Sequence, residues 1–174
     1  MFDVLIIGGG ASGLSCALVL GSAKEKAFAQ NKKIAIVTHQ KTSHLQTALF
    51  NNVLGLIPGT TGESILQSGK AQLQDLYPHV TQINSEKVLE ITQMEGYFLV
   101  TTNKNKYQTK LVVVAAGYTN LLRIKGLESY IKPHPRAKAD KNRIWLENND
   151  HLITEGLYVT GTLAGWRSQF AMAC

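Results

Sequence analysis

A short apolar run followed by three glycines opens the chain and limits the folds that it can take. Val4–Ile7 is too short for a helix, contains β-branched residues and is stopped by glycine, so it predicts a strand buried on both faces. Gly8, Gly10 and Gly13 follow at the spacing G-x-G-x-x-G. At this spacing the first glycine permits a tight turn, the second lets the backbone approach a diphosphate, and the third lets a helix pack closely on the strand.

The residues that follow supply the context that a glycine pattern needs, because glycines also occur in ordinary turns. A helix of small and apolar residues is predicted from Ser12 to about Ala23, and Lys33–Val37 predicts a second strand. The helix would direct unpaired N–H groups and the positive end of its dipole at the loop, where Ser12 could add a hydroxyl donor. This β-α-β unit favours dinucleotide binding over an ordinary α/β turn.

The rest of the pattern predicts a three-layer α/β domain of the Rossmann-like, FAD/NAD(P)-binding type. Apolar residues show helical spacing from Gly62 to Tyr77, and a hairpin is expected where Gly96–Thr102 and Tyr107–Leu111 flank a polar turn. We expect a parallel sheet built from strands near residues 4, 34, 88, 112 and 158, with a small antiparallel β piece around residues 96–110. Further predicted strands are Val80–Ile83, Lys87–Thr92 and Leu157–Gly161.

Three segments carry weaker patterns. Val53–Gly59 is extended and rich in turn residues, which is typical of a loop that faces a ligand. Tyr118–Asp150 is basic and irregular. A final helix is expected to start in Ser168–Cys174.

The length and composition predict one globular domain over residues 1–174. The chain is 44% hydrophobic and 17% charged, which is typical of a protein with a packed core. No stretch is long and apolar enough to cross a membrane. The first residues lack the basic start of a signal peptide and are needed for the first strand, so we expect a cytoplasmic protein.

The charged and reactive side chains point to no catalytic or metal centre. The net charge is +6, but the lysines alternate with polar and acidic residues, which favours a solvated surface or a mild attraction for anionic cofactors over nucleic-acid binding. Cys16 and Cys174 are far apart and form no C-x-x-C pair, so neither a metal site nor a dithiol is predicted. The five histidines have no carboxylate partner at motif spacing, and the catalytic residues stay unknown.

Three pieces of sequence, in this order, resemble the FAD domain of the thioredoxin reductase-like pyridine nucleotide-disulfide oxidoreductases. Asp3–Gly13 resembles the first FAD motif, Val113–Gly117 the A-[TA]-G turn, and Gly156–Gly161 through Gln169 the second FAD motif. Between them, Asn52-x-x-Gly55 with Thr61-Gly-Glu63 is similar to the family's Asn-Tyr-Pro-Gly loop and the helix start that follows it, which the resemblance implies lie along the flavin. The resemblance covers nearly the whole chain.

The resemblance implies a role for each matching position. The glycine loop would hold the pyrophosphate of FAD, Asn52 would approach the isoalloxazine ring, and the main chain around Val88 would meet the adenine. Gly117 would let the cofactor pass, and the residues after Gly161 would line its ribitol and pyrimidine end. The complete set of implied cofactor residues is Gly8, Gly10, Ala11, Ser12, Gly13, Thr38, His39, Asn52, Val88, Ala116, Gly117, Gly161, Thr162, Gln169 and Phe170.

Two positions depart from the family pattern. The family usually ends its second strand with an acid for the adenosine ribose, whereas here Val37 is followed by Thr38, His39, Gln40 and Lys41. His39 and Lys41 could meet a 2′-phosphate, as in an NADP site, although exposed polar residues are the favoured alternative. Thr162 stands at the Asp of the second FAD motif, which removes a charge-assisted hydrogen bond worth roughly 1.5–3 kcal/mol.

The larger departure is a whole domain. Full-length reductases insert an NADPH domain with its own glycine loop, and the residues between Tyr118 and Leu157 are too few to form one. Short, single-domain thioredoxin reductase-related proteins are therefore the closer match. The implied function is a small FAD-binding oxidoreductase-like protein without the NADPH domain or the C-x-x-C dithiol, reduced by external NAD(P)H or by a redox partner protein.

Alternative functions stay open at this point. The chain could be a non-catalytic FAD- or nucleotide-binding module or subunit, and an NADP-dependent dehydrogenase is a weaker alternative that rests on His39 and Lys41. Nucleic-acid binding would require salt-sensitive retention on DNA or RNA. A homodimer is a further hypothesis, because the apolar residues Val53–Ile57 would lie uncovered without a second domain.

Overall fold

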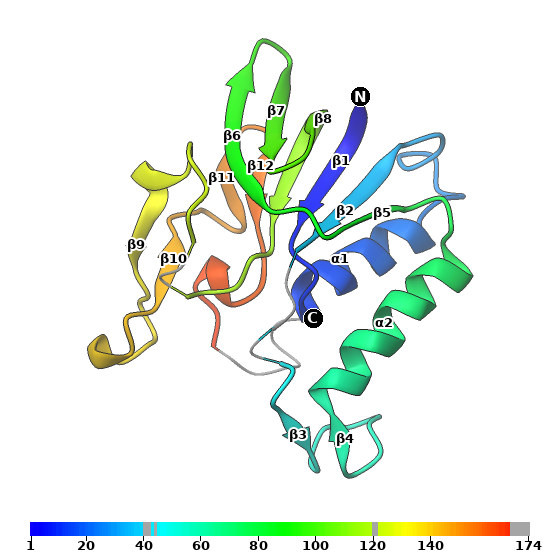
Figure 1. Ribbon diagram of the computed structural model, residues 1–174, viewed down its shortest axis with the longest axis vertical. Helices are drawn as coiled ribbons and strands as arrows, with labels where there is room; N and C mark the ends of the chain where they lie inside the picture. The colour runs from blue at the N-terminus through cyan, green and yellow to red at the C-terminus, as the bar shows by residue number, and fades with distance from the viewer. Residues whose placement is uncertain (40–42, 44, 120–121, 168–174) are drawn as a thin grey trace.

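The computed structural model, which describes residues 1–39, 43, 45–119 and 122–167, is built on a central sheet with five parallel strands. Their order in the sheet is β12-β8-β1-β2-β5. Each neighbouring pair in this order is parallel, so all five strands run in the same direction and end at one edge of the sheet (Figure 1). Their bounds are β1 Phe2–Ile7, β2 Ile34–Thr38, β5 Thr81–Asn84, β8 Lys106–Val114 and β12 Leu157–Val159.

Strand β1 lies in the middle of this sheet. Leu5 and Ile6 are fully buried on opposite faces, as expected for a short apolar run that has a strand on each side. The chain leaves β1 for β2 on one side and later returns to β8 on the other. The strand order thus reverses at β1, and such a reversal opens a crevice beyond the carboxyl end of the strand.

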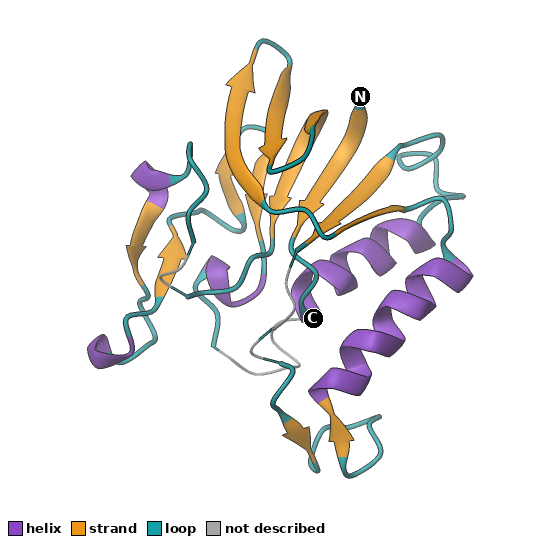
Figure 2. Cartoon of the chain, viewed as in Figure 1, coloured by secondary structure: helices purple, strands orange, loops and turns teal. Residues whose placement is uncertain are grey.

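Two helices cover one face of the sheet (Figures 1 and 2). α1 spans Ala11–Ser22 and α2 spans Gly62–Leu76, in agreement with the two predicted helices. Leu14 and Leu73, one from each helix, pack with Ile6 and Ile36 of the sheet in one buried cluster. No helix among the residues that the structure describes is both long and apolar enough to cross a membrane.

An antiparallel hairpin packs on the other side of the sheet and forms the remaining layer. β6, Val88–Met94, pairs with β7, Tyr97–Thr102, and β7 pairs in turn with the first half of β8. Ile91 and Val100 of this hairpin belong to the same buried cluster as Leu5 and Val112. The predicted three-layer α/β fold and the predicted hairpin turn before β8 are confirmed.

The prediction that the strand near residue 88 belongs to the parallel sheet is wrong. The strand near residue 88 pairs antiparallel with β7, and the parallel neighbour of β2 is instead β5. β5 has the sequence Thr-Gln-Ile-Asn and lies at the sheet edge, where half-exposed polar residues replace the apolar run that marks a central strand. Between the two strands the chain turns at Ser85, whose φ is 60°.

The later part of the chain contains regular structure that its sequence did not indicate. Within the segment predicted as irregular, short strands β9 and β10 pair antiparallel. β11 joins the main sheet beside β12, and β3 pairs with β4 beyond the N-terminus of α2 (Figure 1). The predicted helix in Ser168–Cys174 lies outside the described residues. The remaining bounds are β3 Leu49–Phe50, β4 Thr60–Thr61, η1 Glu128–Tyr130, β9 Ile131–Pro133, η2 Ala139–Lys141, β10 Ile144–Leu146, β11 Leu152–Thr154 and η3 Gly161–Ala164.

Candidate functional site

The glycine loop after β1 packs directly on the end of β8. Gly8 has a φ of 121°, and a Cβ atom there would overlap the carbonyl oxygen of Ala115. A Cβ atom on Gly13 would overlap the carbonyl oxygen of Gly8. Both positions therefore require glycine, because a side chain would push the loop away from the strand and the helix away from the loop.

Gly10, the middle glycine of the G-x-G-x-x-G motif, leaves the N-terminus of α1 open. Gly10 is the N-cap of α1, provides no side-chain hydrogen bond, and is followed by no acidic residue in the first turn. A Cβ atom on Gly10 would have Ser43 Oγ, at 3.6 Å, as its nearest neighbour. Ala11 and Ser12 form the first turn, where backbone N–H groups have no partner within the helix. An anion is the natural partner for these groups.

The other long helix, α2, carries capping groups that α1 lacks. The Thr61 side chain accepts a hydrogen bond from the Ser64 N–H, at 3.1 Å, and Glu63 places a negative charge in the first turn of α2. α1 has neither feature. The contrast indicates that the open end of α1 is a local property of the glycine loop.

The carboxyl end of β2 lies beside the loop and carries a hydroxyl group in place of an acid. A Cβ atom on Gly9 would lie 2.7 Å from Cγ2 of the buried Thr38. Thr38 Oγ1 donates to Asn84 Oδ1 at 2.8 Å, so the ends of β2 and β5 are linked. His39 follows Thr38 and is exposed, whereas Lys41 lies outside the described residues.

The ends of β8 and β12 complete the same edge. Gly117 has a φ of 75° and a Cβ atom there would meet nothing within 4 Å. Ala116 precedes it and is half-buried. Gly161, with a φ of 71°, begins the short helix η3, and Thr162 follows it. The structure thus brings these four residues to the edge that holds the glycine loop.

A buried histidine fixes the turn after β12. His134 Nδ1 accepts a hydrogen bond from the Arg136 N–H at 3.2 Å, so the proton is on Nε2. Nε2 then donates to the carbonyl oxygen of Thr162 at 3.1 Å. His134 comes from the segment after β9, far from Thr162 in sequence, and no motif marked this contact.

Of the remaining four predicted cofactor residues, Asn52 lies away from this edge, Val88 has a buried side chain in a segment that reaches the end of β2 through the Glu86 N–H to Thr38 carbonyl hydrogen bond, and two lie outside the described residues. Asn52 is exposed in the segment that follows β3, near the far end of α2 from the sheet (Figure 1). Val88 is buried in β6, opposite Thr102. Gln169 and Phe170 lie outside the described residues.

Sequence reasoning missed two polar residues beside the loop. Ser43 lies next to Gly10, and Asn84 ends β5 in contact with Thr38. Asn84 would have been found if the polar edge strand had been assigned to the parallel sheet, because the carboxyl ends of parallel strands meet at one edge. Ser43 carries no comparable signal in the sequence.

The described residues include no group that is evidently prepared for acid–base or thiol chemistry. Burial raises the pKa of the Cys16 thiol to about 11, which disfavours the reactive thiolate near neutral pH. His151 Nδ1 contacts the Val159 carbonyl oxygen at 2.8 Å. Within this part of the chain no three His, Cys, Asp or Glu side chains are grouped as metal ligands would be.

Comparisons with known proteins give a consistent relationship. The ferredoxin–NADP reductase of Streptococcus gordonii is 29% identical over 143 residues, which are 77% of this chain and 42% of that protein. The crystal structure of an oxidoreductase from Agrobacterium tumefaciens is 27% identical, with a TM-score of 0.56 over 74% of this chain and 41% of the other. This chain therefore spans less than half the length of the curated relatives that it matches first.

A third likeness concerns the fold alone. The ferredoxin-flavin thioredoxin reductase of Clostridium acetobutylicum is 16% identical and aligns with a TM-score of 0.67, over 99% of this chain and 92% of that one.

The sequence model of the family described as pyridine nucleotide-disulphide oxidoreductase matches residues 2–161. This range contains the glycine loop and the central sheet and ends at Gly161, the first residue of η3, and the chain belongs to the pyridine nucleotide-disulphide oxidoreductase family.

Proposed function

We propose that residues 1–174 form an FAD-binding domain of the thioredoxin reductase-like type, which serves an oxidoreductase. The observation that carries this proposal is the open N-terminus of α1 above a loop whose first and last glycines admit no side chain. A cofactor diphosphate would take the N–H groups of the first helical turn. The names of the relatives support an oxidoreductase and leave the reaction of this chain to experiment.

The residues at the sheet edge suit the rest of this cofactor. Thr38, held by Asn84, would offer neutral oxygen atoms to the adenosine ribose in place of an acid. The open space at Gly117 would let the cofactor pass close to the backbone. Thr162 and the turn that His134 fixes would lie toward the flavin end. Bound FAD would itself supply the electron-transfer chemistry, and the chain would bind and orient it.

The electron donor would come from outside these residues. We propose that NAD(P)H or a redox partner protein reduces the flavin, since the only described cysteine, Cys16, is a half-buried thiol whose raised pKa disfavours the thiolate. The same observation favours a second candidate, a non-catalytic FAD- or nucleotide-binding module. An NADP-dependent dehydrogenase is the weaker alternative, in which the exposed His39 would face a 2′-phosphate and the purified protein would bind NADPH without a flavin spectrum.

A matched pair of glycine substitutions tests the cofactor site. Gly10→Ala should leave folding intact, because φ at Gly10 is −82° and the nearest atom to the new Cβ would be 3.6 Å away. The same Cβ would crowd an incoming diphosphate, so we expect FAD affinity, measured by quenching of flavin fluorescence, to fall about tenfold or more. The control Gly69→Ala makes the same change in α2, where the new Cβ would lie 3.2 Å from Cδ1 of Leu14, a side-chain end that can shift, and it should keep wild-type affinity. Equal affinities for all three proteins would remove the glycine loop from the site.

We also propose that the chain forms a homodimer through the loop between β3 and β4. The side chains of Leu54 and Ile57 in this loop are 103% and 81% exposed. Neighbouring large apolar side chains left in water are typical of a surface that a partner covers. A second copy would cover both side chains. Light scattering should give the mass of a dimer for the wild type and of a monomer for Leu54→Ser/Ile57→Ser, whereas a monomeric wild type would end the hypothesis.

A further inference from the structure

A second pocket, apart from the proposed cofactor site, lies in the segment that follows β8. It has a volume of ≈ 330 Å³, and none of its lining residues is among those that the sequence assigned to FAD. Tyr118 and His134 form part of its wall. Its described lining contains no acidic residue and five cationic ones, which are Arg136, Lys138, Lys141, Arg143 and Arg167.

Backbone hydrogen bonds hold the wall of the pocket in place. The His134 N–H donates to the Arg143 carbonyl oxygen at 2.9 Å, and the Ile144 N–H donates to the Tyr118 carbonyl oxygen at 3.0 Å. The segment after β8, the end of β9 and the start of β10 are thereby joined. The cations at their surface are carried by a fixed backbone, which reduces the ordering cost of binding a ligand.

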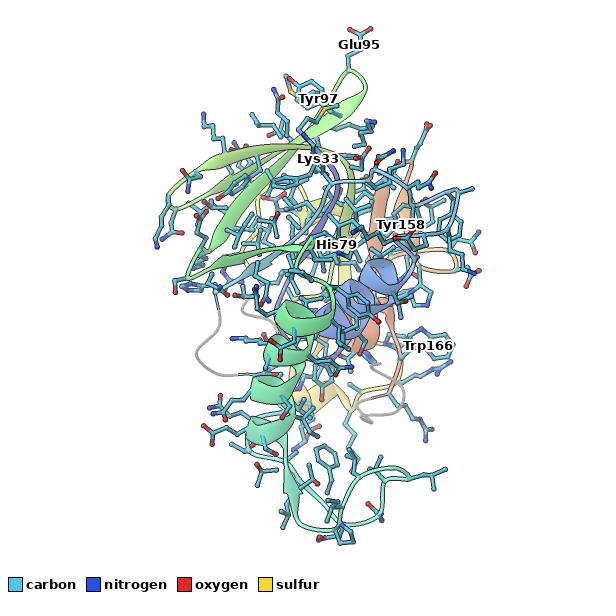
Figure 3. The ribbon with its side chains drawn as sticks, turned by 90° about the vertical axis from the view of Figure 1, so that its right-hand side faces the viewer. Lys33, His79, Glu95, Tyr97, Tyr158 and Trp166 are labelled. Carbon is cyan, nitrogen blue, oxygen red and sulfur yellow. The ribbon has the colours of Figure 1, made fainter. Side chains whose placement is uncertain are left out.

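Aromatic rings orient two of the guanidinium groups. Arg143 Cζ lies 4.7 Å from the centre of the Tyr118 ring, and that ring meets His134 edge-on with 5.6 Å between centres. Arg136 Cζ lies 5.0 Å from the ring of Trp166, which Figure 3 labels. A ring that covers the face of a guanidinium group leaves the N–H groups in its plane, the arrangement that suits two oxygen atoms of a phosphate or carboxylate.

Three of the five cations of the pocket have no acidic partner in the described structure. Among the residues that the structure describes, Arg136, Lys138 and Lys141 form no ion pair. Asp140, in the same turn as Lys138 and Lys141, does not line the pocket. Like charges gathered around a hollow repel one another, and a bound polyanion relieves that repulsion.

We propose that this pocket binds a small phosphate ester that carries at least two negative charges. The volume is at the lower end of the range of about 300–1,000 Å³ for small-molecule sites, and the concave shape favours a compact ligand over a nucleic-acid strand. The Nε2 of His134 contacts the Thr162 carbonyl oxygen at 3.1 Å, so the pocket adjoins the turn after β12. The proposal does not depend on FAD binding.

Calorimetric titration of the whole chain with inorganic pyrophosphate, at about 0.15 M ionic strength and with excess FAD present to occupy the glycine loop, tests this site. We expect saturable binding at one site, and an affinity at least about tenfold lower for Lys138→Gln/Lys141→Gln, which removes two exposed charges from the pocket. The control Lys24→Gln/Lys26→Gln removes the same charge beyond the C-terminal end of α1, on the other side of the molecule (Figure 1). It should bind pyrophosphate within about twofold of the wild type.

Further titrations separate this pocket from the glycine loop and identify the source of the phosphate. Pyrophosphate should bind with unchanged affinity to protein saturated with FAD, and the flavin should stay bound. ADP and NADPH binding tighter than pyrophosphate would point to a nucleotide, and equal affinities would point to the phosphates alone; both results support the site. Absence of saturable binding, an equal loss in both double variants, or release of FAD by pyrophosphate would overturn the proposal, as would tighter binding of a short DNA duplex.

Discussion

At the scale of single residues, the same residue type serves opposite purposes in the glycine loop. Gly8 and Gly13 are required by the fold, because a Cβ atom at either position would overlap a backbone oxygen. Gly10 has an ordinary φ of −82° and free space around its missing Cβ. Its role must therefore lie in what approaches from outside, which is why substitution of Gly10 tests function and substitution of Gly13 would test packing.

A buried carboxylate links the hairpin β6–β7 to β8. Glu86 accepts hydrogen bonds from Thr102 Oγ1 at 2.6 Å, Asn105 Nδ2 at 2.7 Å and Tyr107 Oη at 2.9 Å. Burial acts to raise the pKa of Glu86, but these three donors outweigh it and lower the pKa below its usual value. The charged form is thus the one that the folded protein stabilises.

This network predicts a pH dependence of stability. Because the folded-state pKa of Glu86 lies below the unfolded value of about 4.3, its contribution is fully present above that value and is lost as the pH falls through the folded pKa. Glu86→Gln should lower the free energy of unfolding by about 1–3 kcal/mol at pH 7, and the difference from wild type should shrink toward pH 3. Urea denaturation at a series of pH values measures both effects.

The control for this measurement is a glutamate in the turn of the hairpin β6–β7. Glu95 is exposed at the outer tip of the hairpin β6–β7 (Figure 3), and Glu95→Gln should change stability at pH 7 by less than about 0.5 kcal/mol. A constant difference between Glu86→Gln and wild type at every pH would contradict the role assigned to the Glu86 carboxylate.

At the scale of elements, the long apolar and amphipathic segments could be predicted and the short polar ones could not. β1, β2, α1, α2 and the hairpin before β8 follow from periodicity, glycines and turn residues. The sequence predicts β5 as a strand at Val80–Ile83, but its place beside β2 could not be predicted, because Thr-Gln-Ile-Asn has no apolar run and its pairing with β2 is made by backbone groups. β9 and β10 have three residues each, too few for an alternation of buried and exposed positions to show.

The same reason explains which parts of the candidate site were found. The glycine loop is indicated by its spacing between a predicted strand and a predicted helix, and the turn after β12 by its resemblance to a local motif of the family. Asn84 and His134 act through contacts with Thr38 and Thr162, which are distant in sequence. The contact of Asn84 with Thr38 depends on the order of strands in the sheet, and the contact of His134 with Thr162 depends on the position of β9. Local sequence patterns predict neither.

The difference between the two helix N-termini gives a prediction at this scale. Thr61→Ala removes the side-chain cap of α2 and leaves the Ser64 N–H without its partner. We expect the free energy of unfolding to fall by about 1 kcal/mol, within a range of about 0.5–2 kcal/mol. The exposed Thr47 provides the control, since Thr47→Ala should change stability by less than about 0.5 kcal/mol in the same urea titration. Equal stabilities of Thr61→Ala and wild type would show that the cap contributes nothing.

At the scale of the whole molecule, the carboxyl edge of the parallel sheet and the basic pocket beside it are separate features. The first is built from the ends of β1, β2, β8 and β12, and the second from the segment between β8 and β11 together with Arg167 after η3. The chain spans about two fifths of the curated relatives that it matches first, so the reactions of those longer proteins cannot be transferred to it directly. The cofactor is the property that this part of the molecule can be tested for by itself.

The most direct test is the visible absorption spectrum of the purified protein after incubation with FAD and removal of the excess. We predict a retained flavin band in the wild type, a weaker band in Gly10→Ala, and bleaching of the wild-type band when NADPH, NADH or a reduced partner protein is added without oxygen. A retained flavin band that none of these donors bleaches would support the second candidate function, a non-catalytic FAD-binding module. A protein that retains no flavin under these conditions would contradict the central claim that the carboxyl edge of this sheet is an FAD site.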